Sequence, residues 1–150
     1  MCIQNNESGE KIPIEILHKE IDIIQACITR MAQNSFSMKK WAIGILLGII
    51  ALMNQKDFFN TYTYFLIVPV LILWYYDAYF LYQEKMFRKL YDWTIEKRLE
   101  GTREKLYDLT LDRFEQNPTP FQLMFESYLL YFYLMIGGSV FGMIYSVLQS

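Results

Sequence analysis

The chain has few of the residues on which enzymes and disulfide-stapled proteins depend. Its 150 residues include one histidine, two cysteines and four prolines. Cys2 and Cys27 lie far apart without metal-ligand spacing, so each is expected to be a buried or idle thiol. The single histidine, His18, is expected to be solvated, and no CxxC, HExxH, P-loop or GxGxxG motif is present. We therefore predict no enzymatic activity, no catalytic residue, no cofactor and no metal site.

A strong charge imbalance is also missing. The formal net charge is −2, which gives no basic surface for nucleic acid, so direct nucleic-acid binding is not expected. Residues 1–12 are polar and lack the apolar core of a signal peptide. These residues are interpreted as a polar tail.

The chain is rich instead in apolar and aromatic residues, which make up 53% and 17% of it. They are separated along the chain from the charged residues and form apolar stretches at 41–53, 62–82 and 128–148. The first stretch corresponds to about 20 Å of helix, the second contains Pro69, and the third has no charge. Long uncharged runs are typical of bilayer-spanning helices, so the sequence predicts an all-α membrane protein with three transmembrane helices.

Before the first stretch, apolar residues recur at alternating steps of three and four. This spacing is a heptad seam, which allows one helix to pack against another. A long amphipathic helix is therefore predicted to begin after Pro13. Its partner is either the segment 85–115 of the same chain or a second subunit of a homo-oligomer. The seam consists of Ile14, Leu17, Ile21, Ile24, Ile28 and Met31.

Between the second and third stretches the chain is charge-dense and favours helix from Glu84 to Glu115. Gly101 is a position at which this helix could bend or divide, and residues 117–120, which contain two prolines, end it. The predicted organisation is a tail and seam helix at 1–40 and two spans at 41–83. These are followed by a charged helix with a proline turn at 84–127, and then by a third span with a short tail at 128–150.

The lysines and arginines predict the orientation. Thirteen of the fourteen lie before residue 41 or within 84–127, on one side of the predicted membrane. By the positive-inside rule that side is the cytoplasm. The N-terminus and the charged helix are therefore predicted to be cytoplasmic, and the C-terminus extracytoplasmic.

Two glycine pairs indicate close helix packing. Gly44 and Gly48 lie four residues apart in the first span, and Gly138 and Gly142 do so in the third. Such pairs let helix backbones approach closely. They pack either the two spans of one subunit together or one span against a neighbouring subunit.

Asp77 is the one acid within a predicted span, and such residues suggest function. It shares a helix stripe with Glu84 and Arg88, and the lysines Lys39 and Lys40 are its expected charge partners. These five residues are the candidate gating or charge-pair positions. In the alternative interpretation, Asp77 lies at the membrane interface and is held by tyrosine hydroxyls or lysines.

Two runs resemble small bacterial membrane proteins. The run WYYDAYFLYQEKMFRKLY at residues 74–91 contains W-x-x-D-A-Y followed by E-x-x-x-R-x-L-Y, and IQACITRMAQNSF at 24–36 is similar to the helix that enters their first span. The general plan resembles SLATT-type effectors of bacterial antiphage systems. That resemblance implies a membrane-perturbing effector of the bacterial inner membrane under the control of a partner.

The predicted function is a homo-oligomeric inner-membrane channel or membrane-disrupting effector, controlled by a cytoplasmic partner or signal in antiphage defence. The alternative is a non-conducting membrane anchor that recruits a cytoplasmic defence enzyme. A small transporter subunit that uses Asp77 is a third hypothesis. The expected partners are the lipid bilayer, further copies of the chain and a cytoplasmic protein.

Overall fold

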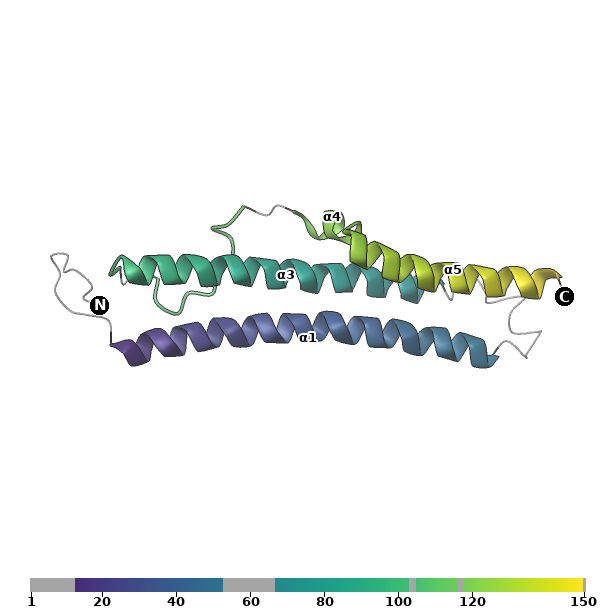
Figure 1. Cartoon of the computed structure of the whole chain (residues 1–150), viewed down its shortest axis with the longest axis horizontal. Helices are drawn as coiled ribbons and strands as arrows, with labels where there is room; N and C mark the ends of the chain where they lie inside the picture. Colours follow the sequence, from purple (N-terminus) through teal and green to yellow (C-terminus); the bar gives the residue numbers. More distant parts are fainter. Residues whose placement is uncertain (1–12, 53–66, 103–104, 116–117, 150) are drawn as a thin grey trace. The chain divides into compact units, whose positions relative to one another are not determined.

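The computed structural model describes residues 13–52, 67–102, 105–115 and 118–149. This part of the chain is helical and contains no strand. Its helices are α1 (Ile14–Leu52), α3 (Ile67–Leu99), α4 (Pro120–Met124) and α5 (Ser127–Gln149), as shown in Figure 1. α1 and α3 are long, single helices that each contain both charged and apolar stretches.

The prediction of three transmembrane helices is wrong for this structure. Among the residues it describes, no helix combines the length and the apolar character that crossing a bilayer requires. This finding contradicts the membrane part of the predicted fold class. It also contradicts the predicted inner-membrane location with its inside–outside topology, and the identification as a membrane channel.

In α1 and α3 the uncharged runs within the described residues are short or interrupted. In α1 the run from Trp41 to Leu52 corresponds to about 18 Å, against roughly 30 Å of bilayer hydrocarbon. In α3 Asp77 interrupts the run that begins at Ile67, and the residues at 62–66 lie outside the described part. α5 is uncharged from Ser127 to Gln149, and tyrosines, glycines and serines are interspersed among its apolar residues.

The chain divides into two compact units, which are described separately. Unit 1 consists of the described residues of Met1–Met31 and Gln83–Asn117, and unit 2 of those of Ala32–Tyr82 and Pro118–Ser150. Each unit contains part of α1 running antiparallel to part of α3 (Figure 1). α4 and α5 belong to unit 2.

In unit 1 the buried residues of α3 recur every four positions. These positions are Met86, Leu90, Thr94 and Arg98. A step of four turns the buried face by about 40° each time, so it moves gradually around the helix. Leu99, the last residue of the helix, is exposed.

α3 ends at Leu99, just before Gly101, where the sequence allows a bend or division of the helix. The helix expected to continue to Glu115 is absent from the described residues beyond it. Gly101 has φ +79°, and the N–H groups of Gly101 and Thr102 donate to the carbonyl oxygens of Arg98 and Lys97. This arrangement is a Schellman motif, which glycine permits because it has no Cβ. Residues 105–115 then follow as turns without regular helix.

In unit 2 the core joins α1, α3 and α5. Its fully buried members are Ala42, Val70, Tyr133 and Ile136. α4 begins with a capping box, in which Thr119 and Gln122 exchange side-chain and backbone hydrogen bonds and Pro120 occupies the first turn. The indole N–H of Trp74 donates to the carbonyl oxygen of Met124 at 3.1 Å and so ties the end of α4 to α3.

Candidate functional site

The strongest concentration of polar contacts in unit 2 surrounds Asp77 on α3. Its side chain is 0% exposed. The Lys39 ammonium lies 2.7 Å from each carboxylate oxygen, and the Ser35 hydroxyl donates to Oδ1. The Tyr133 hydroxyl donates to Oδ2 at 3.2 Å. One carboxylate therefore joins side chains from α1, α3 and α5.

Helix periodicity on α1 explains why two of these donors meet at Asp77. Ser35 and Lys39 lie four residues apart, so their side chains share one face of the helix. The Lys39 ammonium also donates to the Ser35 hydroxyl at 3.1 Å. This pair presents a cation and a hydroxyl together to the facing carboxylate.

Tyr133 reaches Asp77 from α5 and is held in place by aromatic packing. Its ring is stacked on Trp74 with centroids 5.7 Å apart. Burial, and then the neighbouring Asp77 charge, raises the pKa of Tyr133 above its ordinary range. Tyr133 therefore remains a protonated hydrogen-bond donor at any pH at which the fold is studied.

The arrangement around Asp77 suits helix positioning better than chemistry on a substrate. The carboxylate has no exposed surface and accepts hydrogen bonds from three donors. Lys39, 19% exposed, is the member nearest to solvent, and its ammonium lies 5.6 Å from the Tyr128 ring centroid. No group of histidine, cysteine or acidic side chains within the described ranges is arranged to hold a metal ion.

The structure separates the other candidate gating residues from Asp77. Lys40 is exposed and lies over the Phe36 ring at 5.1 Å, so Lys39 alone of the two lysines pairs with Asp77. Glu84 and Arg88 pair with each other in unit 1 at 2.7 Å. The predicted stripe of Asp77, Glu84 and Arg88 is therefore not one site.

The predicted seam residues of α1 fall into buried, partly buried and exposed positions. Ile24 is buried, Ile14 is exposed, and Leu17, Ile21, Ile28 and Met31 are partly buried. The fully buried positions of this part of α1 are Glu20, Ile24 and Cys27, which is a face rotated slightly from the predicted seam. Part of the seam consequently remains available at the surface of unit 1.

The predicted packing glycines have open space beside them among the residues that the structure describes. A Cβ built on Gly44, Gly48, Gly138 or Gly142 meets no atom within 4 Å. Packing of one span against another within the subunit would place atoms there. The glycine positions of α1 and α5 therefore face open space.

Sequence reasoning missed a second buried ion pair, in unit 1. The Arg98 Nε and Nη2 atoms donate to the two carboxylate oxygens of Glu20 at 2.8 and 2.9 Å. Arg98 also donates to the carbonyl oxygen of Thr102, and the Tyr107 N–H donates to Glu20 at 2.9 Å. The pair thus joins α1 and α3 to the turns that follow α3.

The electrostatics of Glu20 follow from these contacts. Burial acts to raise the pKa of Glu20, but the hydrogen bonds from Arg98 and Tyr107 and the Arg98 charge outweigh it and lower the pKa. Nothing in the sequence distinguishes Glu20 from its charged neighbours except its place four residues before Ile24. If the buried face of α1 had been counted from Glu20, the helical pattern would have predicted that Glu20 is buried.

The fold and these two clusters define a class: a protein that is mainly helical in its described residues and divides into two units, with a buried ion pair between α1 and α3 in each. The chain matches no protein-family model, no curated protein and no solved structure. The resemblance to SLATT-type effectors therefore stays a prediction, and the function is argued from the geometry.

Proposed function

We propose that this chain is a non-catalytic helical protein that associates with further copies of itself, and that unit 2 supplies the association surface. The observation that carries this proposal is the number of large apolar side chains that unit 2 exposes. Large exposed apolar surfaces mark interaction sites, so a concentration of exposed apolar side chains in one unit favours association there.

The exposed apolar residues are concentrated in unit 2. Within the described part of unit 1, the exposed large hydrophobic side chains are Ile14, Leu99 and Tyr107. In unit 2 they occur on α1, α3, α4 and α5, and at Phe125, which directly follows α4. The most exposed are Phe36, Trp41, Leu47, Phe121, Tyr131, Met135 and Phe141. Burial of such side chains contributes about 1.5–3 kcal/mol each, which favours association.

The open glycine positions support contact between copies rather than within one. Gly44 and Gly48 lie beside the exposed residues Ile43 and Leu47 on α1, and a side chain added at either glycine would meet nothing. A helix surface without side chains lets a second backbone approach closely. Of the two alternatives for these glycines, this favours packing against a neighbouring subunit.

The Asp77 cluster has a positioning role in this proposal. By joining α1, α3 and α5, it holds the helices that carry the apolar surface in one arrangement. Buried polar contacts of this kind are best attested as devices that specify register. Control of the assembly by a second protein is part of the proposal, and a role in antiphage defence rests on the resemblance alone.

The proposal is tested by measuring the mass of the full chain over a range of concentrations by sedimentation and mass photometry. We expect species larger than the monomer, and we expect Leu47→Glu to reduce their mass. Leu99→Glu is the matched control, because the two leucines are exposed to 60% and 64% and lie in different units. A wild-type chain that is monomeric at every concentration, or that binds only lipid vesicles or another protein, contradicts the proposal.

A further inference from the structure

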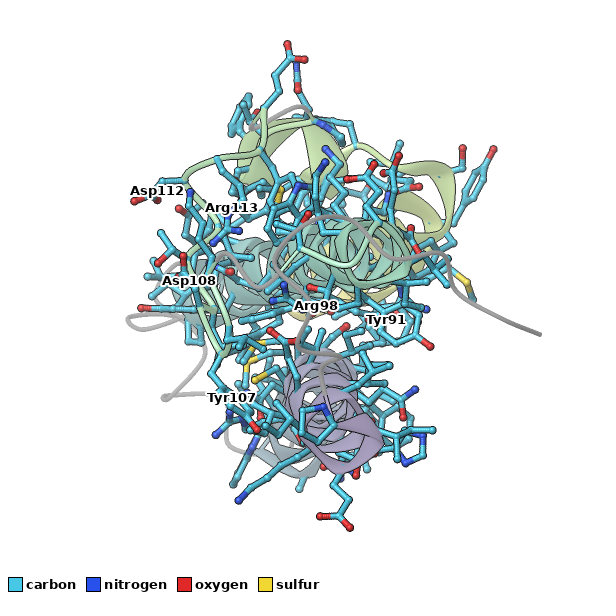
Figure 2. All side chains as sticks on the ribbon, turned by 90° about the vertical axis from the view of Figure 1, so that its left-hand side faces the viewer. Tyr91, Arg98, Tyr107, Asp108, Asp112 and Arg113 are labelled. Carbon is cyan, nitrogen blue, oxygen red and sulfur yellow. The ribbon has the colours of Figure 1, made fainter. Side chains whose placement is uncertain are left out.

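In unit 1 the turns at 105–115, here called the strap, lie on one side of the α1–α3 pair. Figure 2 is a view along the helices, in which Tyr107 and Asp108 lie on one side of the pair and Tyr91 on the other, with Arg98 between them. The strap contains no helix. The chain thus covers one side of the pair with a segment that has no regular secondary structure.

The strap is attached to both helices. The Tyr107 N–H donates to the Glu20 carboxylate on α1 at 2.9 Å. The Arg113 guanidinium lies 4.5 Å from the Trp93 ring centroid on α3. Because Glu20 also pairs with Arg98, the Tyr107 N–H fastens the strap to an ion pair that the helices form between themselves.

Other hydrogen bonds lie within the strap itself. The Arg113 guanidinium pairs with the Asp108 carboxylate, which also accepts from the Thr110 N–H at 2.9 Å. The Arg113 Nε donates to the carbonyl oxygen of Thr110, and the Phe114 N–H donates to that of Leu111, both at 3.1 Å. These bonds do not involve α1 or α3. The strap can therefore leave the helices without losing them, and it moves as one piece.

Little apolar burial holds the strap in place. None of its residues is fully buried, and its apolar members Leu106, Leu109, Leu111 and Phe114 are partly buried. The fully buried residues of the described part of unit 1 all lie on α1 and α3. A segment with few buried apolar contacts opens at a lower free energy than the core beside it.

The attached state of the strap also carries three local costs. Lys105 and Tyr107 have φ of 56° and 59°, a left-handed conformation that a Cβ makes unfavourable. The Arg113 Nη1 atom is buried and has no hydrogen-bond partner among the described residues. Detachment relieves all three costs, because the backbone relaxes and Nη1 reaches water.

We propose that the strap is a conformational device, which detaches from α1 and α3 as one unit while the two helices stay paired. The helices keep the Glu20–Arg98 ion pair, since Arg98 bonds to both carboxylate oxygens from α3. Detachment uncovers this ion pair and the Trp93 ring. Unit 1 thereby has two states with different surfaces. The inference concerns no surface of unit 2 and does not depend on self-association.

Residue-resolved hydrogen exchange of the full wild-type chain tests the proposal, at neutral pH and at several low denaturant concentrations. The Tyr107 amide is the readout, because its acceptor lies on α1. We expect its protection factor to lie roughly a hundredfold or more below those of Ile24 and Leu90, which are buried on the helices. It should also depend little on denaturant, since detachment exposes little surface.

Two glycine substitutions within the strap test the stored strain. Lys105→Gly removes the Cβ from a left-handed residue, so the protection of the Tyr107 amide should rise by about threefold or more. Asp112→Gly is the matched control, because Asp112 is exposed in the same strap and its φ is not positive. It adds freedom to the detached state and should lower the protection about two- to fivefold.

Three results would overturn the proposal. If the Tyr107 amide exchanges with Ile24 and Leu90 and shares their denaturant dependence, the strap opens only when the whole unit unfolds. If the Tyr107 amide has no protection, the strap is not attached in solution. If Lys105→Gly and Asp112→Gly change the protection in the same direction, the left-handed residues store no strain. Ile24 and Leu90 are measured in the same samples, so a loosened unit is distinguished from a detached strap.

Discussion

At the scale of single residues, Asp77 depends on Lys39 because its carboxylate has no exposed surface. We expect Asp77→Asn to lower the free energy of unfolding by about 3 kcal/mol, as removal of one partner of a buried pair usually does. In a double-mutant cycle with Lys39→Gln, the two changes should couple by roughly 0.5–3 kcal/mol. Chemical denaturation of the four proteins measures this coupling.

Lys40→Gln is the control for that cycle. Lys40 lies next to Lys39 in the sequence but is exposed and contacts the Phe36 ring rather than Asp77. Its effect should add to that of Asp77→Asn within experimental error. Additivity for Lys39 as well would mean that the ion pair contributes nothing to the fold in solution.

The buried pair in unit 1 gives a pH dependence of definite sign. Because the folded pKa of Glu20 is lowered, its contribution to stability is present above the ordinary glutamate pKa of about 4.3 and is lost as the pH falls below it. We expect Glu20→Gln to be less stable than the wild type at neutral pH by about 3 kcal/mol, since Arg98 stays buried without its partner. The difference should shrink between pH 4 and the lowered pKa.

Thermal unfolding over a pH series measures the effect of Glu20→Gln. Glu96→Gln serves as the control, because Glu96 is exposed on the same helix as Arg98. Its substitution should leave the loss of stability at acid pH unchanged. A stability difference between the wild type and Glu20→Gln that is constant with pH would refute the proposed link between the pair and the acid sensitivity.

At the scale of elements, two glycines should respond in opposite ways to the same substitution. Gly101 ends α3 with φ +79°, where a Cβ is strained, so Gly101→Ala should destabilise by about 1–2 kcal/mol. Gly44 lies inside α1 with open space around it, so Gly44→Ala should stabilise the isolated fold by about 0.5–1 kcal/mol. Denaturant titrations at low protein concentration measure both changes.

The association state separates structural from functional roles for Gly44. If Gly44 faces a second copy, Gly44→Ala should weaken association although it stabilises the fold. Gly101→Ala should not change the dissociation constant of the oligomer, once the fraction of unfolded chain is taken into account. Stronger association after Gly44→Ala would argue that this face does not contact another helix closely.

The helices show which parts of the fold could be predicted from the sequence. The heptad spacing and Pro13 predicted a long helix from Ile14, and α1 begins there. Gly101 was identified as a point at which the helix could bend or divide, and α3 ends there by a Schellman motif. The helix expected beyond it to Glu115 was wrong, because charged helix-favouring residues do not reveal the turns at 105–115. The three predicted spans were wrong, because no helix within the described residues is both long enough and apolar enough to cross a membrane.

The candidate site could be predicted only in part. Asp77 and Lys39 were identifiable because an acid in an apolar run needs a cation, and they lie 2.7 Å apart. Tyr133 could not be assigned to them, since no local pattern reports which of many tyrosines approaches from another helix. Glu20 and Arg98 were equally hidden, because charged residues of a buried pair look the same in the sequence as those of a solvated face.

At the scale of the whole molecule, self-association links stability to concentration. Binding of further copies to the folded chain alone stabilises it by mass action. We therefore expect the melting temperature to rise as the concentration of wild-type protein is raised, and to rise less for Leu47→Glu. Differential scanning calorimetry at several concentrations measures this. A melting temperature independent of concentration would argue for a folded monomer with a tolerated apolar surface.

The two buried ion pairs also carry directional information. In unit 1 the acid is on α1 and the base on α3, whereas in unit 2 the base is on α1 and the acid on α3. Glu20 and Lys39 are separated along α1 by nearly the same length as Asp77 and Arg98 along α3. If the helices paired in parallel, Glu20 would meet Asp77 and Lys39 would meet Arg98, so both contacts would become repulsive together. The order of these four charges thus favours the antiparallel over the parallel arrangement of α1 and α3.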